Sequence, residues 1–363
     1  MPRERRHPSS APKRDVDLSR RRLLGALSLP WLLGACEERT PTRKEGFLLF
    51  GMPIQITLAG ASPEQAEAAV RAAQAQFEPF YRQIHPWQDS ELTRLNQALP
   101  GGTPVPTSAQ MRELIRLGQQ LSRQSDGLFD PAVGRLVELW GFHNNHPDAP
   151  REPPPETAID ALLHPPPRMD DLSIEGETVL CRNPNVQLDF NAIAEGIAVE
   201  RSLRALRELG LKDVIIDGGG DLGIAGRVGQ RPWRIAIQDP FGPGALAGLD
   251  VEGPLAVFTS GSYRRRFTHA GQSYNHLIDP RTGHPSREPV SATVLHENAI
   301  SADAAATALM VAGIEEAPSI AQRMGASGFL LADSQGALYL SHSLRGRLHW
   351  PQGTPARKVH HVG

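Results

Sequence analysis

Apolar and polar residues alternate closely enough over Phe47–Leu58 to predict a strand near the start of the globular part of the chain. Residues 62–65, Ser-Pro-Glu-Gln, then supply a helix cap, a proline at the first helical position and a Gln that completes a capping box, so a helix is predicted to about Ile84. A second cap at Thr107, with a Gln three residues later, predicts a helix that ends at about Gln124.

The rest of the chain alternates between strand-length and helix-length patterns. Between His146 and Pro167 many prolines surround a short helical pattern, Glu156–Leu163, which predicts an insertion-like surface loop. The strands predicted after it are Val186–Phe190, Val214–Asp217, Trp233–Gln238, Leu255–Thr259, Val290–Leu295 and Gly328–Ala332, and the helices are Ile193–Leu209 and Ser301–Ala312. This mixture predicts an α+β fold with mixed sheets flanked by helices, as one domain over residues 47–345, followed by a flexible tail over residues 346–363.

The first 46 residues carry a different pattern. Adjacent arginines in Ser19–Leu24 precede an apolar run that ends at Ala35, which is typical of a twin-arginine export signal. The run is shorter than the roughly 20 apolar residues that a membrane-spanning helix needs. It leads into Leu-Gly-Ala-Cys, which resembles a lipobox, so we expect residues 1–35 to be a signal peptide, Cys36 a lipid anchor and residues 36–46 a tether. The expected location is the periplasmic side of the inner membrane; the alternatives are a buried helix behind a basic surface, and a cysteine that only happens to stand near a cleavage site.

Composition and charge narrow the classes of function. The 363 residues are 40% hydrophobic and 21% charged, an ordinary globular composition. Loss of residues 1–35 would leave 30 basic and 37 acidic residues, so the net charge would move from −2 to −7. A nucleic-acid partner is not expected, because phosphate backbones bind basic patches and the remaining basic run, Arg264–Arg266, is interpreted as a solvated strand end. With Cys36 lipidated, Cys181 would be the sole free cysteine, which excludes an intrachain disulfide.

Two turns with small residues are candidates for ligand binding. Asp189–Gly196 runs from a predicted strand into a helix, where small residues let a ligand approach the free N–H groups of the helix start. An Asp that merely caps a helix explains the same residues. Asp217–Gly223 has the G-x-G-x-x-G spacing of a dinucleotide-binding turn, but the glycines and Pro232 after it cannot sustain the helix that this motif must open. We interpret it as a glycine-rich turn that lies close to a ligand or to another strand.

Two further segments carry candidate metal-binding and acid–base groups. Ser301 is expected to cap an Ala-rich helix on which Asp303 and Thr307 lie four residues apart on one face. Their oxygens suit a hard cation such as Mg²⁺, although contacts with the helix dipole and backbone account for them equally well. His276 stands three residues before Asp279 of an Asp-Pro-Arg-Thr-Gly turn and could act as a base near neutral pH; a hydrogen-bonded structural histidine is the alternative.

These segments occur in one order together with two others. One is Ser125–Gly134, which runs on to Leu139–Phe142, and the other is Asp-Ser-Glu-Leu at residue 89, which leads to Leu-Asn at residue 95. The combination, over roughly Phe50 to Gly313, resembles the ApbE family of FAD:protein FMN transferases. The resemblance implies that the FMN half of FAD is transferred to a Thr or Ser hydroxyl of an acceptor protein through a phosphoester bond, with Mg²⁺ present and AMP released.

The resemblance also assigns residues to the site. Those that would line the FAD are Leu128, Phe129, Asp130, Asp189, Glu195 and Leu277. Those that would bind Mg²⁺ are the Ala192 carbonyl, the Asp303 carboxylate and the Thr307 hydroxyl. The chain departs from the family pattern at Phe50, where Met is usual, and at Trp87, which matches a family aromatic residue near FAD only after a shift of one position.

In this interpretation His276 is the general base, and Asp279 either orients it or serves the turn alone. The nearest alternative is a Mg²⁺-dependent FAD pyrophosphatase, in which water replaces the acceptor hydroxyl. A lipoprotein that binds FAD without chemistry is an alternative of another class, and a nicotinamide-dependent oxidoreductase rests only on the glycine spacing. The expected acceptor is a membrane redox subunit, and the chain would reach the membrane through its N-terminal lipid.

Overall fold

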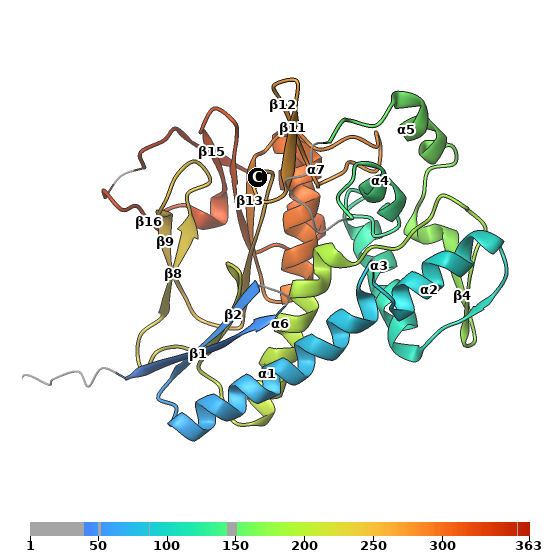
Figure 1. The fold of residues 1–363 in the computed structure, drawn as a ribbon. Helices are drawn as coiled ribbons and strands as arrows, with labels where there is room; N and C mark the ends of the chain where they lie inside the picture. Colours follow the sequence, from blue (N-terminus) through green and yellow to red (C-terminus); the bar gives the residue numbers. More distant parts are fainter. Residues whose placement is uncertain (1–39, 50–51, 87, 144–150, 354) are drawn as a thin grey trace, which may run out of the picture. The chain divides into compact units, whose positions relative to one another are not determined.

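A nine-stranded sheet forms the centre of the protein, a computed structural model of which describes residues 40–49, 52–86, 88–143, 151–353 and 355–363 (Figure 1). In their order across the sheet the strands are β1 (Thr42–Leu49), β2 (Met52–Ala59), β6 (Val214–Gly218), β7 (Asp221–Ala225), β10 (Leu255–Gly261), β13 (Ser291–His296), β14 (Gly328–Ala332), β15 (Leu338–Ser341) and β17 (Val359–Val362). Neighbouring strands are antiparallel except β15 and β17, which are parallel.

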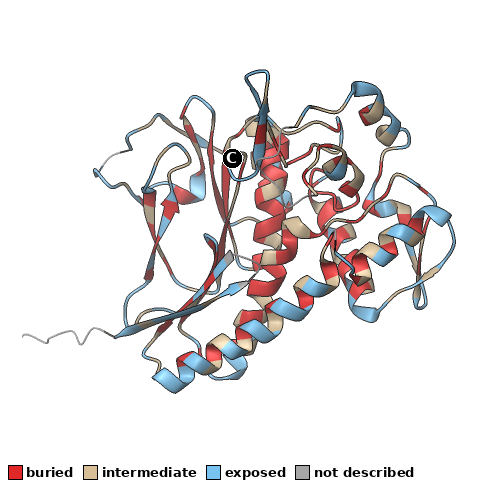
Figure 2. Cartoon of the chain, viewed as in Figure 1, coloured by how far each residue is buried: buried red, intermediate tan, exposed pale blue. Residues whose placement is uncertain are grey.

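Three helices pack with the sheet into the main core: α1 (Pro63–Ile84), α6 (Asn191–Glu208) and α7 (Ala299–Arg323). Helix α7 is buried along most of its length (Figure 2), because its alanines allow close packing on β10, β13 and α6. At Gly196 of α6 an added Cβ would lie 2.7 Å from the Ala299 carbonyl oxygen and 2.9 Å from the Asp303 Cβ. This glycine therefore admits a neighbouring helix, whereas the sequence pattern led us to expect that it would admit a ligand.

A second core lies around a smaller sheet of β8 (Trp233–Gln238), β9 (Ala245–Val251) and β16 (Leu348–His349). Residues along β8 alternate between buried and exposed, as expected for a strand with one face packed. The buried face packs with Ile224, Val257 and Leu330 of the large sheet. The large sheet is thus covered by helices in one core and by this small sheet in the other.

The remaining elements frame one end of the helical layer, except the last 3₁₀ turn, which packs against β14 in the second core. They are α2 (Glu91–Ala98), α3 (Ala109–Gln124), α4 (Gly134–Leu139), α5 (Glu156–Leu163), the strands β3 (Val105–Pro106), β4 (Leu172–Glu175) and β5 (Thr178–Cys181), the hairpin β11 (Arg266–His269) and β12 (Gln272–Asn275), and the 3₁₀ turns η1 (Leu99–Gly101), η2 (Met169–Asp171) and η3 (His342–Leu344). A third, small core joins α4, α5 and the hairpin through Trp140, Phe142, Ile159 and Phe267. Among the residues described, no helix is both long and apolar enough to cross a bilayer.

The predicted α+β class is confirmed, and most predicted elements are present within one or two residues of their expected bounds. The capping box at the start of α1 forms as expected: the Gln65 N–H donates to Ser62 Oγ at 3.2 Å and the Ser62 N–H donates to Gln65 Oε1 at 2.9 Å. Two other caps were misplaced. Ser108 rather than Thr107 caps α3, and Asn298 rather than Ser301 caps α7. In both cases the predicted residue and the true cap are within three positions of each other, and both side chains can accept a hydrogen bond from a backbone N–H.

Two strand predictions were wrong because pairing is a tertiary property. The single strand over 47–58 is a hairpin of β1 and β2, and β1 begins at Thr42, inside the expected tether. Residues 186–190 form no ladder; this extended segment pairs with residues 131–134 around one bridge, with the Asp189 N–H donating to the Pro131 carbonyl at 2.8 Å. The expected tail over 346–363 contains β16 and β17, which pair with β9 and β15. Unpaired N–H and C=O groups at a sheet edge favour such additions.

Candidate active site

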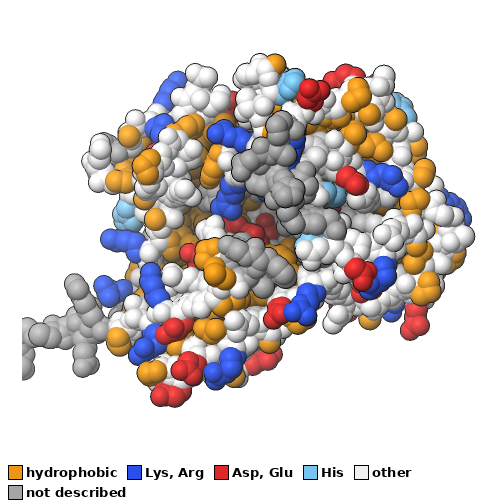
Figure 3. Space-filling model, viewed as in Figure 1, with side chains coloured by type: hydrophobic (Ala, Val, Ile, Leu, Met, Phe, Trp, Pro, Cys, Tyr) orange, Lys and Arg blue, Asp and Glu red, His pale blue; other side chains and the backbone are white. Residues whose placement is uncertain are grey.

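A cavity of about 430 Å³ lies where the starts of α6 and α7 meet β7, β10 and the loops around residues 130 and 276. The expected site residues that line it are Leu128, Phe129, Asp130, Asp189, Ala192, Glu195, His276, Leu277, Asp303 and Thr307. Figure 3 shows a hollow near the centre of one face, with acidic side chains inside it and basic side chains beside it. The other expected positions, Phe50, Trp87 and Cys36, lie outside the described residues.

The N-terminal turn of α6 and the helix α7 meet at Asp303. The Gly196 N–H donates to Asp303 Oδ2 at 2.9 Å. One helical turn after Asp303, the Thr307 hydroxyl lies 3.3 Å from the Ser260 hydroxyl on β10. The carboxylate, the hydroxyl and Ala192 therefore line the same cavity, as the resemblance requires.

Three carboxyl groups, on Glu195, Asp221 and Asp303, lie on this side of the cavity. Burial raises the pKa of Asp303 well above its usual value, and the charges of Asp221 and Glu195 raise it further. Burial and Asp221 likewise raise the pKa of Glu195, while burial raises the pKa of Asp221 against the opposing charge of Arg264. The cluster is short of positive charge, so a bound cation would stabilise it. Within the described ranges, no group of three or more His, Cys, Asp or Glu side chains is arranged to hold a metal ion by itself.

His276 lies on another wall of the cavity, with Nδ1 at 3.2 Å from the Arg265 carbonyl oxygen. A carbonyl only accepts hydrogen bonds, so we assign the imidazole proton to Nδ1, which leaves Nε2 with a lone pair. Burial, together with the charge of Arg265, lowers the pKa of His276 to about 4. The ring is therefore neutral near pH 7 and able to accept a proton.

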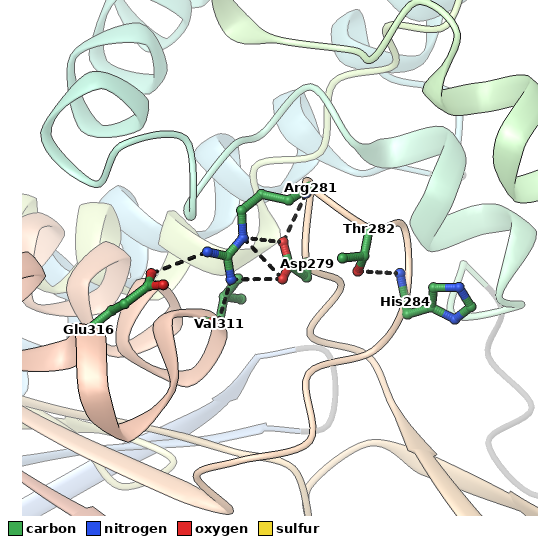
Figure 4. Close-up of polar contacts among 6 residues, drawn as sticks. All are labelled: Asp279, Arg281, Thr282, His284, Val311 and Glu316. Carbon is green, nitrogen blue, oxygen red and sulfur yellow. Dashed lines mark hydrogen bonds and ion pairs between the residues drawn. The ribbon is translucent and has the colours of Figure 1, made fainter.

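Asp279 does not orient His276, contrary to one of the two roles considered for it. Arg281 binds its carboxylate through Nε at 3.0 Å and NH2 at 2.9 Å, and the Arg281 N–H donates to it at 2.8 Å (Figure 4). The same guanidinium contacts Glu316 and the Val311 carbonyl of α7. Asp279 is thus a turn residue that fastens the 279–283 loop to α7.

Asp189 is held by a residue that the sequence patterns did not single out. Its Oδ2 lies 2.8 Å from His143 Nε2, and its Oδ1 accepts the Asn191 N–H at 2.9 Å. Burial alone would raise the pKa of Asp189, but the hydrogen bond and charge of His143 and the charge of Arg265 lower it below its usual value. Asp189 is therefore an ionised residue in the cavity wall, and the chain itself binds both of its carboxylate oxygens.

Several other cavity residues were missed, among them Tyr81, Asp221, Arg264 and Arg265. Asp221 belongs to the glycine-rich turn, which forms the β6–β7 hairpin as interpreted, with Gly219 and Gly220 at positive φ. The two arginines belong to the basic run that we interpreted as solvated. Tyr81 lies on α1 with no local signal, and burial beside Glu195 and Asp303 raises its pKa.

The fold is that of the flavin transferases. The chain is similar to the ApbE protein of Thermotoga maritima, with a TM-score of 0.76, 26% identity and coverage of 85% of this chain and 99% of that one. It is also similar to the flavinyl transferase ApbE of Pseudomonas stutzeri, with a TM-score of 0.72, 29% identity and coverage of 85% and 97%.

The chain belongs to the ApbE family, whose model matches residues 50–330. An FAD:protein FMN transferase of Rhodobacter capsulatus is 38% identical over 86% of this chain, which spans 60% of that protein's length. A second, from Klebsiella pneumoniae, is 31% identical over 87% of this chain, which spans 93% of its length. The resemblance drawn from the motifs is confirmed.

Proposed function

We propose that this protein transfers FMN from FAD to a Thr or Ser hydroxyl of an acceptor protein. The observation that carries the proposal is one cavity that gathers an acidic cluster, a neutral histidine and two arginines in a chain of the ApbE family. A relative of which this chain spans 93% of the length is an FAD:protein FMN transferase. Such a cavity can hold a dinucleotide's phosphates between cations while leaving an opening for an acceptor loop.

The donor chemistry around Asp303 fits Mg²⁺. In an α-helix the Gly196 N–H is the donor to the Ala192 carbonyl. Here the same N–H donates to Asp303 at 2.9 Å, so the Ala192 carbonyl and the Asp303 carboxylate lie on either side of one N–H group. The Ala192 carbonyl, Asp303 and Thr307 would hold the ion, which prefers oxygen ligands and keeps positions for phosphate oxygens. When bound, Mg²⁺ would stabilise negative charge on the pyrophosphate.

His276 is the proposed base. Its Nε2 would accept the proton of the acceptor hydroxyl, whose oxygen bonds to the FMN phosphorus while the bond from that phosphorus to the bridging oxygen breaks and AMP leaves. Nε2 is unprotonated at pH 7 and is therefore available for this role. The products are AMP and a phosphoester between FMN and the acceptor side chain.

The decisive experiment uses the chain without residues 1–35, FAD, Mg²⁺ and the flavin-carrying domain of a membrane redox subunit, with the same domain carrying Thr→Val as control. Transfer predicts flavin fluorescence that survives a denaturing gel, one AMP per flavin attached, and neither product with the Val control. AMP release without attached flavin would instead identify an FAD pyrophosphatase. FAD binding without AMP release would identify a non-catalytic FAD-binding lipoprotein.

We also propose that the chain is exported by the twin-arginine route and anchored in the inner membrane, facing the periplasm, through lipid on Cys36. The adjacent arginines at 20–22 and the Leu-Gly-Ala-Cys sequence support this. Labelled palmitate should enter the wild-type protein but not Cys36→Ser, and replacement of the three arginines by Lys should leave the full-length precursor in the cytoplasm. Wild-type protein without label would overturn the anchor, and processing of the Lys variant would overturn the route.

A further inference from the structure

Three consecutive arginines, Arg264 to Arg266, differ in their position relative to the cavity. Arg264 and Arg265 line the cavity, whereas Arg266 begins β11 and pairs with Asn275 of β12. All three are exposed to some extent, so charge and exposure alone do not separate them. The difference lies in what each guanidinium is already bound to.

Arg265 is engaged by the protein. Its NH2 donates to the Phe142 carbonyl, and its own carbonyl accepts hydrogen bonds from the His276 N–H at 3.2 Å and from His276 Nδ1. Arg265 thus ties the loop after α4 to the histidine. Its position is explained by contacts within the chain.

Arg264 is held more loosely. Its NH1 lies 3.6 Å from Asp221 Oδ2 and its NH2 lies 3.5 Å from the Gly219 carbonyl oxygen, while a side-chain hydrogen bond with Tyr263 adds a third neighbour. Charge-assisted hydrogen bonds are normally about 2.7–2.9 Å long. One third of the Arg264 side chain is exposed, against 5% for Asp221. The guanidinium therefore stands between the buried acidic cluster and the open cavity, with donor capacity to spare.

We propose that Arg264, which lies beside the acidic cluster, binds the pyrophosphate of FAD and so selects flavins that carry a diphosphate. The planar guanidinium matches phosphate oxygens with two parallel N–H donors, which a lysine cannot reproduce. A diphosphate would also bring negative charge to the Arg264 guanidinium, which lies 3.6 Å from the nearest oxygen of its acidic neighbour, Asp221. This inference rests on the proposed function, because it names the part of the substrate that this residue recognises.

The competing explanation is that Arg264 serves only as the counter-ion of Asp221. A counter-ion needs a positive charge but not the paired N–H donors of a guanidinium. It also stabilises Asp221 whether or not a ligand is bound. The two explanations differ in one expectation: only phosphate binding predicts that substitution of Arg264 weakens ligands that carry phosphates and spares those that do not.

The test compares Arg264→Gln with its matched control Arg266→Gln, which removes an equal charge two residues away. Affinities for FAD, ADP and riboflavin are measured by calorimetry in the presence of Mg²⁺. We expect Arg264→Gln to weaken ADP and FAD binding by about 10- to 100-fold and to leave riboflavin binding unchanged. Arg266→Gln should leave all three affinities unchanged. Equal losses for ADP and riboflavin, or no loss for ADP, would overturn the proposal.

Two further variants separate binding from folding and from a counter-ion role. Arg264→Lys keeps the charge and should still bind ADP about 10-fold more weakly than the wild type, because the fork is lost. The double variant Asp221→Asn with Arg264→Gln should remain weak for ADP; recovery to wild-type affinity would show that Arg264 only balances Asp221. Because these readouts are affinities, they stand apart from transfer: a wild type that binds ADP through Arg264 but attaches no flavin would refute the proposed function and not this inference.

Discussion

Asp303 and Asp279 were both candidates for chemistry, and the structure gives them opposite surroundings. Asp279 is bound by the Arg281 guanidinium and backbone N–H and belongs to a network that reaches Glu316. Asp303 accepts a hydrogen bond from the Gly196 N–H and, among the residues described, lies buried beside two other carboxyl groups. A carboxylate whose partners come from the chain supports structure, whereas one whose charge the chain leaves unbalanced is suited to an incoming cation.

The largest effect should come from Asp303→Asn. We expect transfer to fall by at least about 10²- to 10³-fold, because the charge that would hold the cation is lost. The melting temperature should not fall, since the folded-state pKa of Asp303 is raised and its ionised form therefore destabilises the fold at neutral pH. Activity and thermal melting measured on one preparation check both parts, and a variant that unfolds would show that Asp303 is structural like Asp279.

His276→Ala should reduce transfer by about 10²- to 10⁴-fold if the ring is the base. Because its pKa is lowered to about 4, protonation of His276 should not affect the wild-type kcat/KM near neutral pH, and kcat/KM should fall only as the pH drops through about 4. Asp279→Asn is the control and should keep the same acidic limb. A shift of that limb in Asp279→Asn would mean that Asp279 acts on His276 after all.

Asp130 is an intermediate case, since it is buried and the described part of the chain binds it through neutral donors: Ser122 Oγ at 2.8 Å, Ala132 N–H at 2.9 Å and Met169 N–H at 3.2 Å. Burial raises its pKa to about 6. The folded state then binds more protons than the unfolded state between about pH 4 and 6, so the free energy of unfolding should fall by about 3 kcal/mol as the pH rises through that window. Asp130→Asn should flatten this decline, as urea denaturation at several pH values would reveal. An unchanged slope would assign the decline to other groups.

The smallest effect should come from Arg281→Ala. Loss of the contacts to Asp279 and α7 should lower the free energy of unfolding by about 1 kcal/mol, a modest value because Arg281 is 47% exposed. The kcat of transfer should stay within about twofold of the wild type, as expected for a residue that lies outside the reacting groups. A large loss of kcat without a loss of stability would show that the Asp279 network takes part in the reaction, as is proposed for Asp303.

Local sequence patterns were sufficient to predict much of the fold and part of the candidate site. The capping box of α1, the four-residue spacing of Asp303 and Thr307, and the glycine turn that cannot open a helix depend on nearest neighbours along the chain, so the sequence was sufficient to predict them. The order of the motifs identified the family as well, because motif order survives in the chain even where each motif is weak.

Other features depend on partners distant in sequence. The sequence did not reveal that Gly196 admits α7, that residues 359–362 complete the sheet, or that Arg264 faces the cavity while Arg266 enters a strand. Whether a charged side chain is solvated, paired or left unbalanced is set by groups that the fold brings beside it. The sequence alone therefore determined which oxygen donors this protein carries, and the tertiary structure alone decided which of them lack a counter-charge, because electrostatic energies follow distances in space and not separations along the chain.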